Sequence, residues 1–536
     1  MHKFFLVFIV ICLTFKIEAQ TIDSSNLPLI IINTHNQEIP DDFKISAMMK
    51  VVSNGPNQMN HLLDSGNIYT GNIGIEIRGR YSAGLPQKPY GIETRDSSGK
   101  NLSVSLLDMP KENDWILLAN YNDKSFVRNA LAFKMFRDMG HYAPRTMLCE
   151  VIVNDSYQGI YNLTEKIKVD KNRLNIDKLN VNQNEGDTLT GGYLFSIDYY
   201  EWNNSWAGSY SPPGYSGKVV YFVNNYPKPD EITSKQKSYI QNFVYTIEKN
   251  LYSTEYKDPV KGYSSYFDVQ SFIDYFIVNE ISRNVDGYKK SCFYNKSRDS
   301  KGGKIAAGPV WDFDWAWKNI WDCGIFQHTD GSGWAYKILE CDPWPTPTGW
   351  IPRLMQDPPF VSELKSRYTS LRNNILSNSS IMNYIDSVNN LISNAQVRHY
   401  QKWPILGENV GAPELDNIPS TFEGETTKFK NWITTRLNWL DQQMLITSDP
   451  IVPGLNNDDS FLAIYPNPTS EMLTIDANKS ISSISVFSFT GREVLSKTNL
   501  NSSKIQISLK SFPPGLYVAK INLKGGFTRI DKFVIE

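Results

Sequence analysis

The chain has 536 residues, more than one compact domain usually holds, and 41% of them are hydrophobic and 21% charged, as in an ordinary folded protein. The formal net charge of −2 at pH 7 excludes a global preference for an anionic membrane surface, and we expect no nucleic-acid partner. Aromatic residues reach 13%, which is high but does not select a function.

The N-terminal segment is typical of a secretory signal peptide. Lys3 precedes a short apolar run from Phe4 to Phe15, and Ala19 supplies a small residue for cleavage. The run is too short to cross a bilayer, and no other segment has about 18 consecutive apolar residues. We therefore expect a signal peptide over residues 1–19 and an exported mature chain with no transmembrane helix.

Residues 20–446 alternate between strand and helix patterns. Short apolar runs predict strands at IGIEIRGR, PYGIETRD, GGYLFSIDYY and KVVYFV. NDWILLANYNDKSFVRNALAFKMFRDMG predicts a strand, a turn and a helix that starts near Lys124, and MLCEVIVNDSYQGIYNLTEKI predicts a hairpin turning at Asn154 and Asp155. Helical spacing predicts a helix over VQSFIDYFIVNEISRN, and another over residues 429–444 that closes this domain.

The residue composition and the apolar pattern of the chain change near residue 447. Residues 447–460, TSDPIVPGLNNDDS, are rich in Pro, Gly, Asn and Asp, which predicts an extended linker. Residues 461–536 alternate apolar and polar side chains with Gly and Asn at the turns, which predicts a small all-β sandwich. The expected fold class is α+β, followed by an all-β immunoglobulin-like sandwich.

The cysteines give limited information. Cys12 leaves with the signal peptide, and the spacings of the others fit no zinc template. Cys323 and Cys341 lie in one loop-like region and could form a disulfide in an oxidising compartment, which leaves their state open. We do not expect a bond between Cys149 and Cys292.

The motifs that remain favour chemistry by acids and lysines. The chain has no G-x-S-x-G, H-E-x-x-H or Walker motif, and its six His are scattered. In the stretch from Asn279 to Asn319, Asp286 lies in a loop after a helix, and Asp312 and Asp314 end the second strand of a following hairpin. Protein kinases place a catalytic-loop acid and a metal-binding acid in this layout. We therefore expect Asp312 to hold a divalent metal while the neighbouring Trp residues pack its strand.

The C-terminal region resembles the type A sorting domain of the type IX secretion system of Bacteroidetes. The matching residues are Tyr465-Pro466-Asn467-Pro468, Phe489-Thr490-Gly491-Arg492, Pro514-Gly515-Leu516-Tyr517 and Lys532-Phe533-Val534. The resemblance implies that residues 461–536 engage the type IX machinery. The protein would cross the periplasm and the outer membrane and be secreted or held at the cell surface. The alternative is an ordinary adhesive sandwich.

The large domain resembles the spore-coat protein H (CotH) kinase family over nearly all of residues 70 to 445. The matching blocks are Arg78-Gly79-Arg80-Tyr81-Ser82 with Lys88-Pro89-Tyr90-Gly91-Ile92, Trp115 to Ser125 with Arg128-Asn129, Asn154 with Tyr157-Gln158-Gly159-Ile160-Tyr161 and Thr164-Glu165, Asn284 to Tyr288, and Trp311 to Asp314. This resemblance implies an atypical protein-kinase-like fold. It also implies phosphorylation of Ser or Thr in secreted or surface proteins, with ATP and Mg²⁺ or Mn²⁺.

The same resemblance assigns the site residues. Asp286 would be the catalytic-loop acid, and Asp312 would bind the metal with help from Asp314. Lys88 would contact the ATP phosphates, and Glu165 would orient Lys88. Arg78 is a candidate phosphate contact, although it could equally be a structural ion-pair partner.

The sequence departs from the family at two places. Ser291 stands where many relatives carry a metal-binding Asn, which puts a second metal position in doubt. Ala316, Trp317 and Lys318 follow the acids where relatives often have Gly, and they could crowd the phosphate region. Both departures leave room for an inactive kinase-like protein.

Two other classes of function stay open. The Trp-rich region from Trp315 to Trp350 would suit a non-catalytic surface module that binds glycan or protein. A glycoside hydrolase with paired carboxylates in an aromatic cleft would need no nucleotide. A requirement for nucleotide and metal separates the kinase hypothesis from both.

Overall fold

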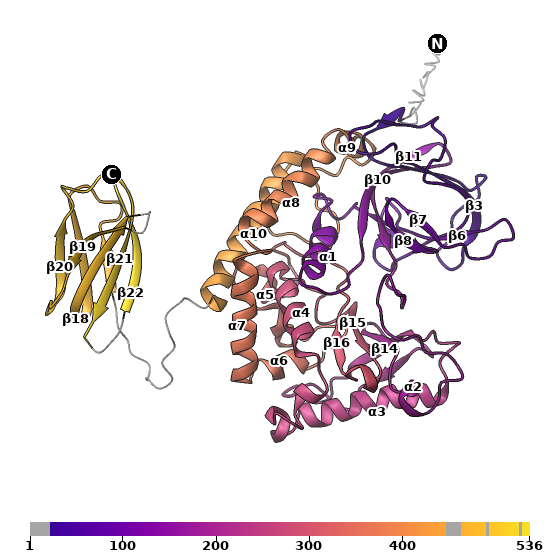
Figure 1. Ribbon diagram of the computed structural model, residues 1–536. Coiled ribbons are helices and arrows are strands. Elements are labelled where there is room, and N and C mark those ends of the chain that lie inside the picture. Colours follow the sequence, from indigo (N-terminus) through magenta and orange to yellow (C-terminus); the bar gives the residue numbers. More distant parts are fainter. Residues whose placement is uncertain (1–21, 446–461, 489–491, 525–527) are drawn as a thin grey trace, which may run out of the picture. The chain divides into compact units, whose positions relative to one another are not determined.

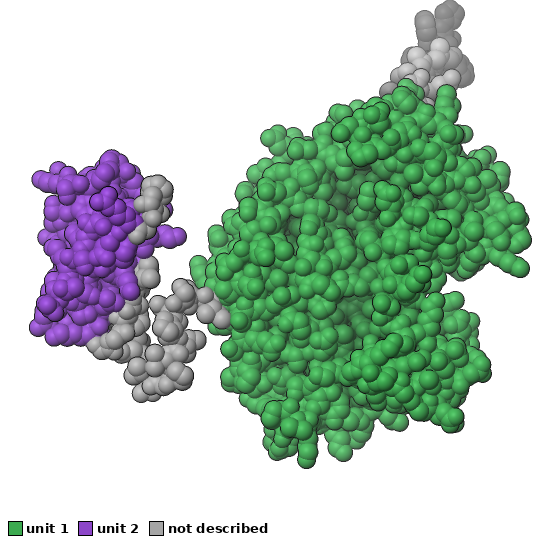
Figure 2. Space-filling model, in the orientation of Figure 1, with its two compact units in different colours: residues 1–445 green, residues 446–536 purple. Residues whose placement is uncertain are grey.

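The computed structural model describes residues 22–445, 462–488, 492–524 and 528–536. The chain divides into two compact units, residues 1–445 and residues 446–536 (Figures 1 and 2). The expected signal peptide and linker lie outside the described residues. Within the described ranges, no helix is both long and apolar enough to cross a membrane.

The first unit begins with a closed barrel. Parallel pairing of the first and last of its strands closes the barrel, which leaves no free sheet edge. Inward-facing apolar side chains such as Trp115 and Tyr161 fill its interior. In the order of pairing the strands are β10 (Thr146–Val153), β11 (Ser156–Glu165), β9 (Asp114–Ala119), β6 (Tyr90–Arg95), β5 (Tyr69–Ile77), β3 (Ile45–Val52) and β2 (Leu29–Asn33).

Two small strand pairs accompany the barrel, and a second sheet lies below it in Figure 1. The pairs are β1 (Ser24–Ser25) with β4 (Asn60–His61), and β7 (Val104–Leu106) with β8 (Met109–Glu112). The second sheet has the order β13 (Ser205–Ala207), β14 (Tyr221–Tyr226), β12 (Tyr193–Ile197), β15 (Cys292–Lys296) and β16 (Ile305–Ala307).

Helices cover this sheet and run along one side of the first unit (Figure 1). The α-helices are α1 (Arg128–Asp138), α2 (Gly186–Leu189), α3 (Ser234–Leu251), α4 (Val269–Ser282), α5 (Gly324–Gln327), α6 (Trp350–Leu354), α7 (Pro358–Arg372), α8 (Asn378–Leu391), α9 (Ala395–Lys402) and α10 (Phe422–Met444). The 3₁₀ turns are η1 (Ser82–Gly84), η2 (Thr254–Lys257), η3 (Tyr263–Ser265), η4 (Asp299–Lys301) and η5 (Ala335–Cys341).

Helix α4 forms the centre of the helical part. It is buried on every side from Ser271 to Ser282, so apolar packing rather than an amphipathic stripe holds it in place. The Asp268 carboxylate caps its first turn by accepting from the Ser271 backbone N–H. Arg283 ends the helix in a left-handed conformation, with φ of 42°, which confirms the predicted end near this residue.

Other local predictions had mixed outcomes. The hairpin β10–β11 turns at Asn154 and Asp155 as predicted, and both residues have positive φ, as a type I′ turn requires. The helix expected from Lys124 starts later, at Arg128. Phe126 is left-handed, and the Asp123 carboxylate accepts from the backbone N–H of Arg128, which delays the first turn.

The second unit is all-β, as predicted, and its described strands form one barrel-like sheet. The long strand β18 pairs with four neighbours, and the last two strands pair with each other. Alternating apolar side chains, including Ile475, Val486 and Phe533, form its own core. The strands are β17 (Leu462–Tyr465), β18 (Met472–Ser488), β19 (Glu493–Lys497), β20 (Ser502–Ser508), β21 (Gly515–Leu523) and β22 (Thr528–Ile535).

The open question about the cysteines is answered by the structure. Cys323 and Cys341 are disulfide-bonded, with their Cα atoms 5.9 Å apart. Cys149 and Cys292 are free and buried.

Candidate active site

A cavity of about 800 Å³ lies where residues of the barrel face residues of the second sheet. The barrel contributes the loop after β5 and the end of β9, and the sheet contributes residues that follow β12 and β16 and precede β15. Its charged lining residues are Arg78, Arg80, Asp198, Glu201, Asp286, Lys289, Lys290, Asp312, Asp314 and Asp322.

Asp286 reaches this cavity because α4 ends at Arg283 and the chain turns at once. Its backbone N–H donates to the Asn284 side-chain oxygen at 3.1 Å, which fixes the turn. Its carboxylate is paired with the ammonium groups of Lys290 at 3.1 Å and Lys289 at 3.8 Å. Burial raises the pKa of Asp286 to about 6, against the effect of Lys290.

Asp312 lies in a loop beyond β16, because that strand ends at Ala307 rather than continuing to Asp314 as predicted. Asp312 is left-handed, with φ of 70°, a conformation that few residues other than Gly adopt. The Asn284 side chain donates to the Asp312 carbonyl at 3.2 Å and ties the two acid-bearing loops together. The Ser291 hydroxyl donates to the Asp312 carboxylate at 3.2 Å.

Asp314 lines the same cavity, and its carboxylate accepts a hydrogen bond from the Asn122 side chain. Burial raises the pKa of Asp314 well above its ordinary value, and the nearby charge of Asp312 raises it further. Ionisation of Asp312 therefore disfavours ionisation of Asp314 in the same cavity.

Arginine and lysine side chains line the same cavity. The Arg78 guanidinium lies over the Trp311 ring, 5.6 Å from its centroid, and the Arg80 guanidinium lies 4.6 Å from the centroid of the Tyr199 ring. Lys290 extends from the loop that carries Asp286. These side chains provide positive charge and hydrogen-bond donors for an anionic ligand.

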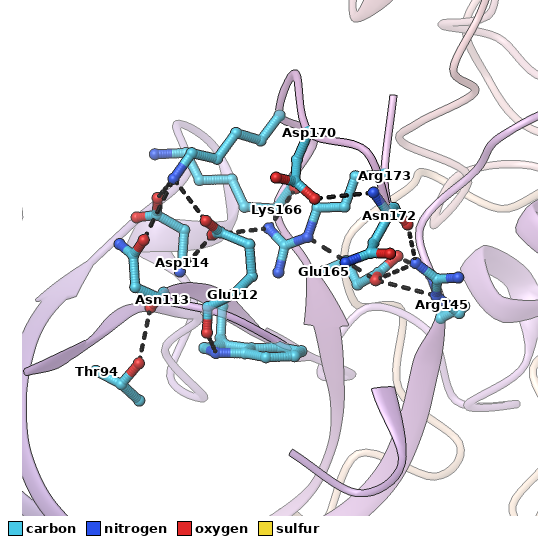
Figure 3. Close-up of polar contacts among 12 residues, drawn as sticks. Thr94, Glu112, Asn113, Asp114, Arg145, Glu165, Lys166, Asp170, Asn172 and Arg173 are labelled. Carbon is cyan, nitrogen blue, oxygen red and sulfur yellow. Dashed lines mark hydrogen bonds and ion pairs between the residues drawn. The ribbon is translucent and has the colours of Figure 1, made fainter. Parts of the chain in front are cut away.

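Glu165 belongs to a different polar cluster, which Figure 3 shows. Its carboxylate is fully buried and accepts from the Arg145 guanidinium at 3.0 and 2.6 Å. The Arg173 guanidinium lies 3.8 Å from it on the other side. Glu165 therefore already has cationic partners.

The predicted pairing of Glu165 with Lys88 is wrong. Lys88 donates to the Ala83 carbonyl at 2.8 Å and is not among the residues that line the cavity. Strand pairing puts Glu165 level with Ile92, about 13 Å along the strands from the level of Lys88. The prediction failed because spacing along the chain does not reveal which end of a barrel strand a side chain occupies.

Sequence reasoning also missed residues that shape the cavity. Asp198 follows β12, and its carboxylate accepts from the Ser291 backbone N–H at 3.1 Å. Burial raises the pKa of Asp198. Asp312 was predicted as a site residue because it is an acid that follows a strand pattern in the sequence. Asp198 follows a strand pattern in the same way. Lys290, four positions after Asp286, had no comparable signal.

Comparison with known proteins gives a family for this geometry. The family model described as CotH kinase protein matches residues 75–440. The chain belongs to this family. The model for the secretion system C-terminal sorting domain matches residues 463–536, which implies export to the cell surface or the medium and an interaction with the type IX secretion machinery.

Other comparisons add little. No curated protein matches the chain. One similar solved structure is a DUF3244 family protein from Bacteroides vulgatus, described as having an immunoglobulin-like β-sandwich fold. It is 18% identical, with a TM-score of 0.13, and the match covers 14% of this chain and 84% of that chain.

The departures of this CotH domain from its family have local explanations. Ala316, Trp317 and Lys318 are buried and do not line the cavity, so the expected crowding of the phosphate region is wrong. The Lys318 ammonium points to Glu414, 3.2 Å away, and to the Asn122 carbonyl. Ser291 does line the cavity and holds the carboxylate of Asp312.

The acids of the CotH domain suit a magnesium or manganese ion that arrives with a nucleotide. In the part of the chain that the structure describes, no group of three or more His, Cys, Asp or Glu side chains could hold a metal ion by itself. Mg²⁺ needs only one or two carboxylates when phosphate oxygens and water complete its coordination. Asp312 and Asp314 offer hard oxygen donors, and a cation would offset both the burial and the nearby Asp312 charge that raise the pKa of Asp314.

Proposed function

We propose that the first unit is an atypical kinase-like phosphotransferase that uses ATP and Mg²⁺ or Mn²⁺ to phosphorylate Ser or Thr in secreted or surface proteins. One observation carries this proposal. Asp286, Asp312 and Asp314 come from two separate loops and line one cavity together with Arg78 and Lys290. Phosphoryl transfer needs such a combination of positioned acids and cations.

Asp286 is the residue we propose as catalytic acid–base group. With a pKa of about 6 its carboxylate is mostly ionised at pH 7, yet basic enough to accept a proton from a hydroxyl group. Its pairing with Lys290 fixes its direction. Asp286 would orient the acceptor hydroxyl and take its proton as the phosphoryl group transfers.

The metal and the phosphates would be held by the remaining charged groups. Asp312 and Asp314 would hold the divalent ion, which would neutralise charge on the phosphates. Arg78, Arg80 and Lys290 would contact phosphate oxygens, a role in which Arg forms paired hydrogen bonds. Lys88 has no such role in this proposal, because its ammonium donates to the Ala83 carbonyl.

A second candidate function is a non-catalytic module that binds glycan or protein. Trp202, Trp321 and Trp344 are 79%, 63% and 60% exposed. Ring contacts through Tyr200 and Tyr221 join Trp202 to Trp344, and a contiguous exposed apolar patch marks an interaction surface. Trp317 and Trp350, from the same Trp-rich region, are fully buried and serve the core. The exposed rings are therefore the observation that favours this alternative.

Thermal unfolding of the mature chain tests the proposal, because a ligand that binds only the folded state raises the melting temperature. We expect ATP with Mg²⁺ or Mn²⁺ to stabilise the protein by about 2.7 kcal/mol at a hundred times its dissociation constant. Asp312→Asn should remove this effect. Asp42→Asn, an exposed acid outside the cavity, should leave it unchanged.

A transfer assay then separates binding from chemistry. Asp286→Asn should still be stabilised by ATP and metal but should lose phosphorylation of Ser or Thr in acceptor proteins, measured with labelled ATP. Absence of stabilisation by ATP and by GTP, across several divalent metals, would reject the phosphotransferase and favour the binding module.

A further inference from the structure

The Cys323–Cys341 disulfide joins two stretches of chain that both reach the cavity. Asp322 directly precedes Cys323, Trp344 follows Cys341 closely, and both line the cavity. The bond therefore closes the base of a loop whose two ends form part of the cavity wall.

The centre of this loop is held independently of the disulfide. The fully buried Arg283 donates to the carbonyls of His328 at 2.8 Å and Ser332 at 2.7 Å. The fully buried Arg436 donates to the carbonyls of Gly331 and Gly333, each at 2.7 Å. Charge-assisted hydrogen bonds of this kind would keep the centre in place without the bond.

The end of the loop near Cys341 is held much less firmly. The Asp342 carboxylate is paired with Lys218, but the two side chains are 69% and 41% exposed, and exposed pairs contribute little. Trp344 is itself largely exposed and meets Tyr221 only edge-on, with ring centroids 6.2 Å apart. Residues 341–344 are exposed or half-buried between the buried Leu339 and Thr346, and the disulfide is the covalent constraint on this short part of the wall.

A short chain of charges leads from the disulfide to the proposed catalytic residue. The Asp322 carboxylate lies 3.7 Å from the Lys289 ammonium, and that ammonium lies 3.8 Å from the Asp286 carboxylate. Lys289 and Asp286 are buried, so their contact is weakly screened by water, whereas the Asp322 side chain is 36% exposed and its contact with Lys289 is weaker. Movement of Asp322 would change the surroundings of Asp286.

We propose that the Cys323–Cys341 bond is a redox switch for the cavity. In the reducing cytoplasm the two thiols remain free, the wall is loose, and the affinity for nucleotide is low. After export, the thiols pass two electrons and two protons to a disulfide-bearing oxidant by thiol–disulfide exchange, which forms the bond and converts the oxidant to two thiols. The switch would keep the protein from acting on ATP before it leaves the cytoplasm, a consequence that rests on the proposed function.

Hydrogen exchange tests the coupling without any ligand. The mature chain is compared oxidised, reduced with a phosphine that is then removed, and as Cys323→Ala/Cys341→Ala. We expect faster exchange at residues 320–323, 340–344 and 286–290, and unchanged exchange at residues 326–336. Unchanged exchange at residues 286–290 in both the reduced protein and the variant would overturn the proposal.

A second experiment measures the affinity for nucleotide. Calorimetry with ATP and Mg²⁺ should show binding about tenfold weaker in the reduced protein and in the double variant, the size of a typical coupling between sites. Asp322→Asn, which keeps the bond, should reproduce part of the loss. Cys149→Ala, which removes a buried thiol outside the bridge, should not.

The two experiments distinguish failure of the proposed function from failure of the proposed switch. If the oxidised protein does not bind nucleotide but exchange at residues 286–290 still responds to reduction, the proposed function fails and the structural coupling stands. If the oxidised and reduced proteins bind equally tightly, the switch is rejected and the proposed function stands.

Discussion

At the scale of single residues, Glu248 shows how the fold determines the ionisation of a buried acid. It lies on α3, where one carboxyl oxygen accepts from the Trp350 indole N–H at 3.2 Å and the other has no hydrogen-bond partner among the described residues. Burial raises the pKa of Glu248 to about 7, although the bond from Trp350 opposes this. Because the folded state then holds a proton that the unfolded state releases above pH 4.5, stability falls as the pH rises from about 4.5 to about 7.

Glu248→Gln should therefore stabilise the protein in a pH-dependent way. The amide keeps the acceptor for Trp350 and cannot ionise, so we expect a gain of about 3 kcal/mol at pH 8 and almost none at pH 4.5. Urea unfolding at both values measures it. Glu363→Gln, at an exposed position of α7, is the control and should show no such dependence. An equal gain at both pH values would show that Glu248 is not kept protonated.

The proposal that Arg78 rather than Lys88 contacts the phosphates gives a second residue-scale prediction. Lys88→Met removes a hydrogen bond to the Ala83 carbonyl, whereas Arg78→Met removes a charge from the cavity. We expect Arg78→Met to weaken ATP binding about tenfold or more, the value of a charge-assisted hydrogen bond, and Lys88→Met to change it by less than about threefold. Calorimetry with ATP and Mg²⁺ measures both, and the opposite order would restore Lys88 as the phosphate contact.

At the scale of elements, a buried ion pair between α10 and α4 also holds the segment that runs from α5 into η5. Arg436 of α10 donates to the Glu280 carboxylate of α4 at 2.9 Å, and neither side chain is exposed. The same carboxylate accepts from the backbone N–H groups of Ala335 and Tyr336. Loss of either charge would leave the other buried without an opposite charge beside it.

Arg436→Met should lower the free energy of unfolding by about 3–5 kcal/mol, because it leaves the Glu280 charge and two loop carbonyls unpaired. Lys134→Met removes the partner of Asp138 in a pair that is more than one-third exposed, and should cost about 1 kcal/mol or less. Chemical unfolding of both variants compares them. Equal losses would mean that the buried pair does not hold α10 to α4.

Elements also show how far the sequence could predict this structure. Local chemistry was sufficient where neighbouring residues decide the outcome, as at the Asn154–Asp155 turn and at the end of α4 near Arg283. Closure of the barrel depends on parallel pairing of β2 with β10, which no local pattern encodes. The acids at 286 and 312 could be grouped from their order along the chain, but the partner of Glu165 depended on strand register.

At the scale of the whole molecule, the two units have separate cores and separate family matches. We therefore expect a chain that ends at residue 445 to unfold within about 2 °C of the first unit's transition in the full chain, because the first unit keeps a complete hydrophobic core of its own. Scanning calorimetry of both chains measures this. A large fall in the transition temperature would show that the first unit depends on the second for stability.

The same truncation should prevent export beyond the periplasm, because the sorting domain lies wholly within the removed residues. In a bacterium with a type IX system, the full chain should reach the surface or the medium, and the chain that ends at residue 445 should accumulate in the periplasm. Residues 446–536 joined to a periplasmic reporter form the matched control and should carry it across the outer membrane. Export of the truncated chain, or retention of the reporter in the periplasm, would show that the signal for export lies in the first unit.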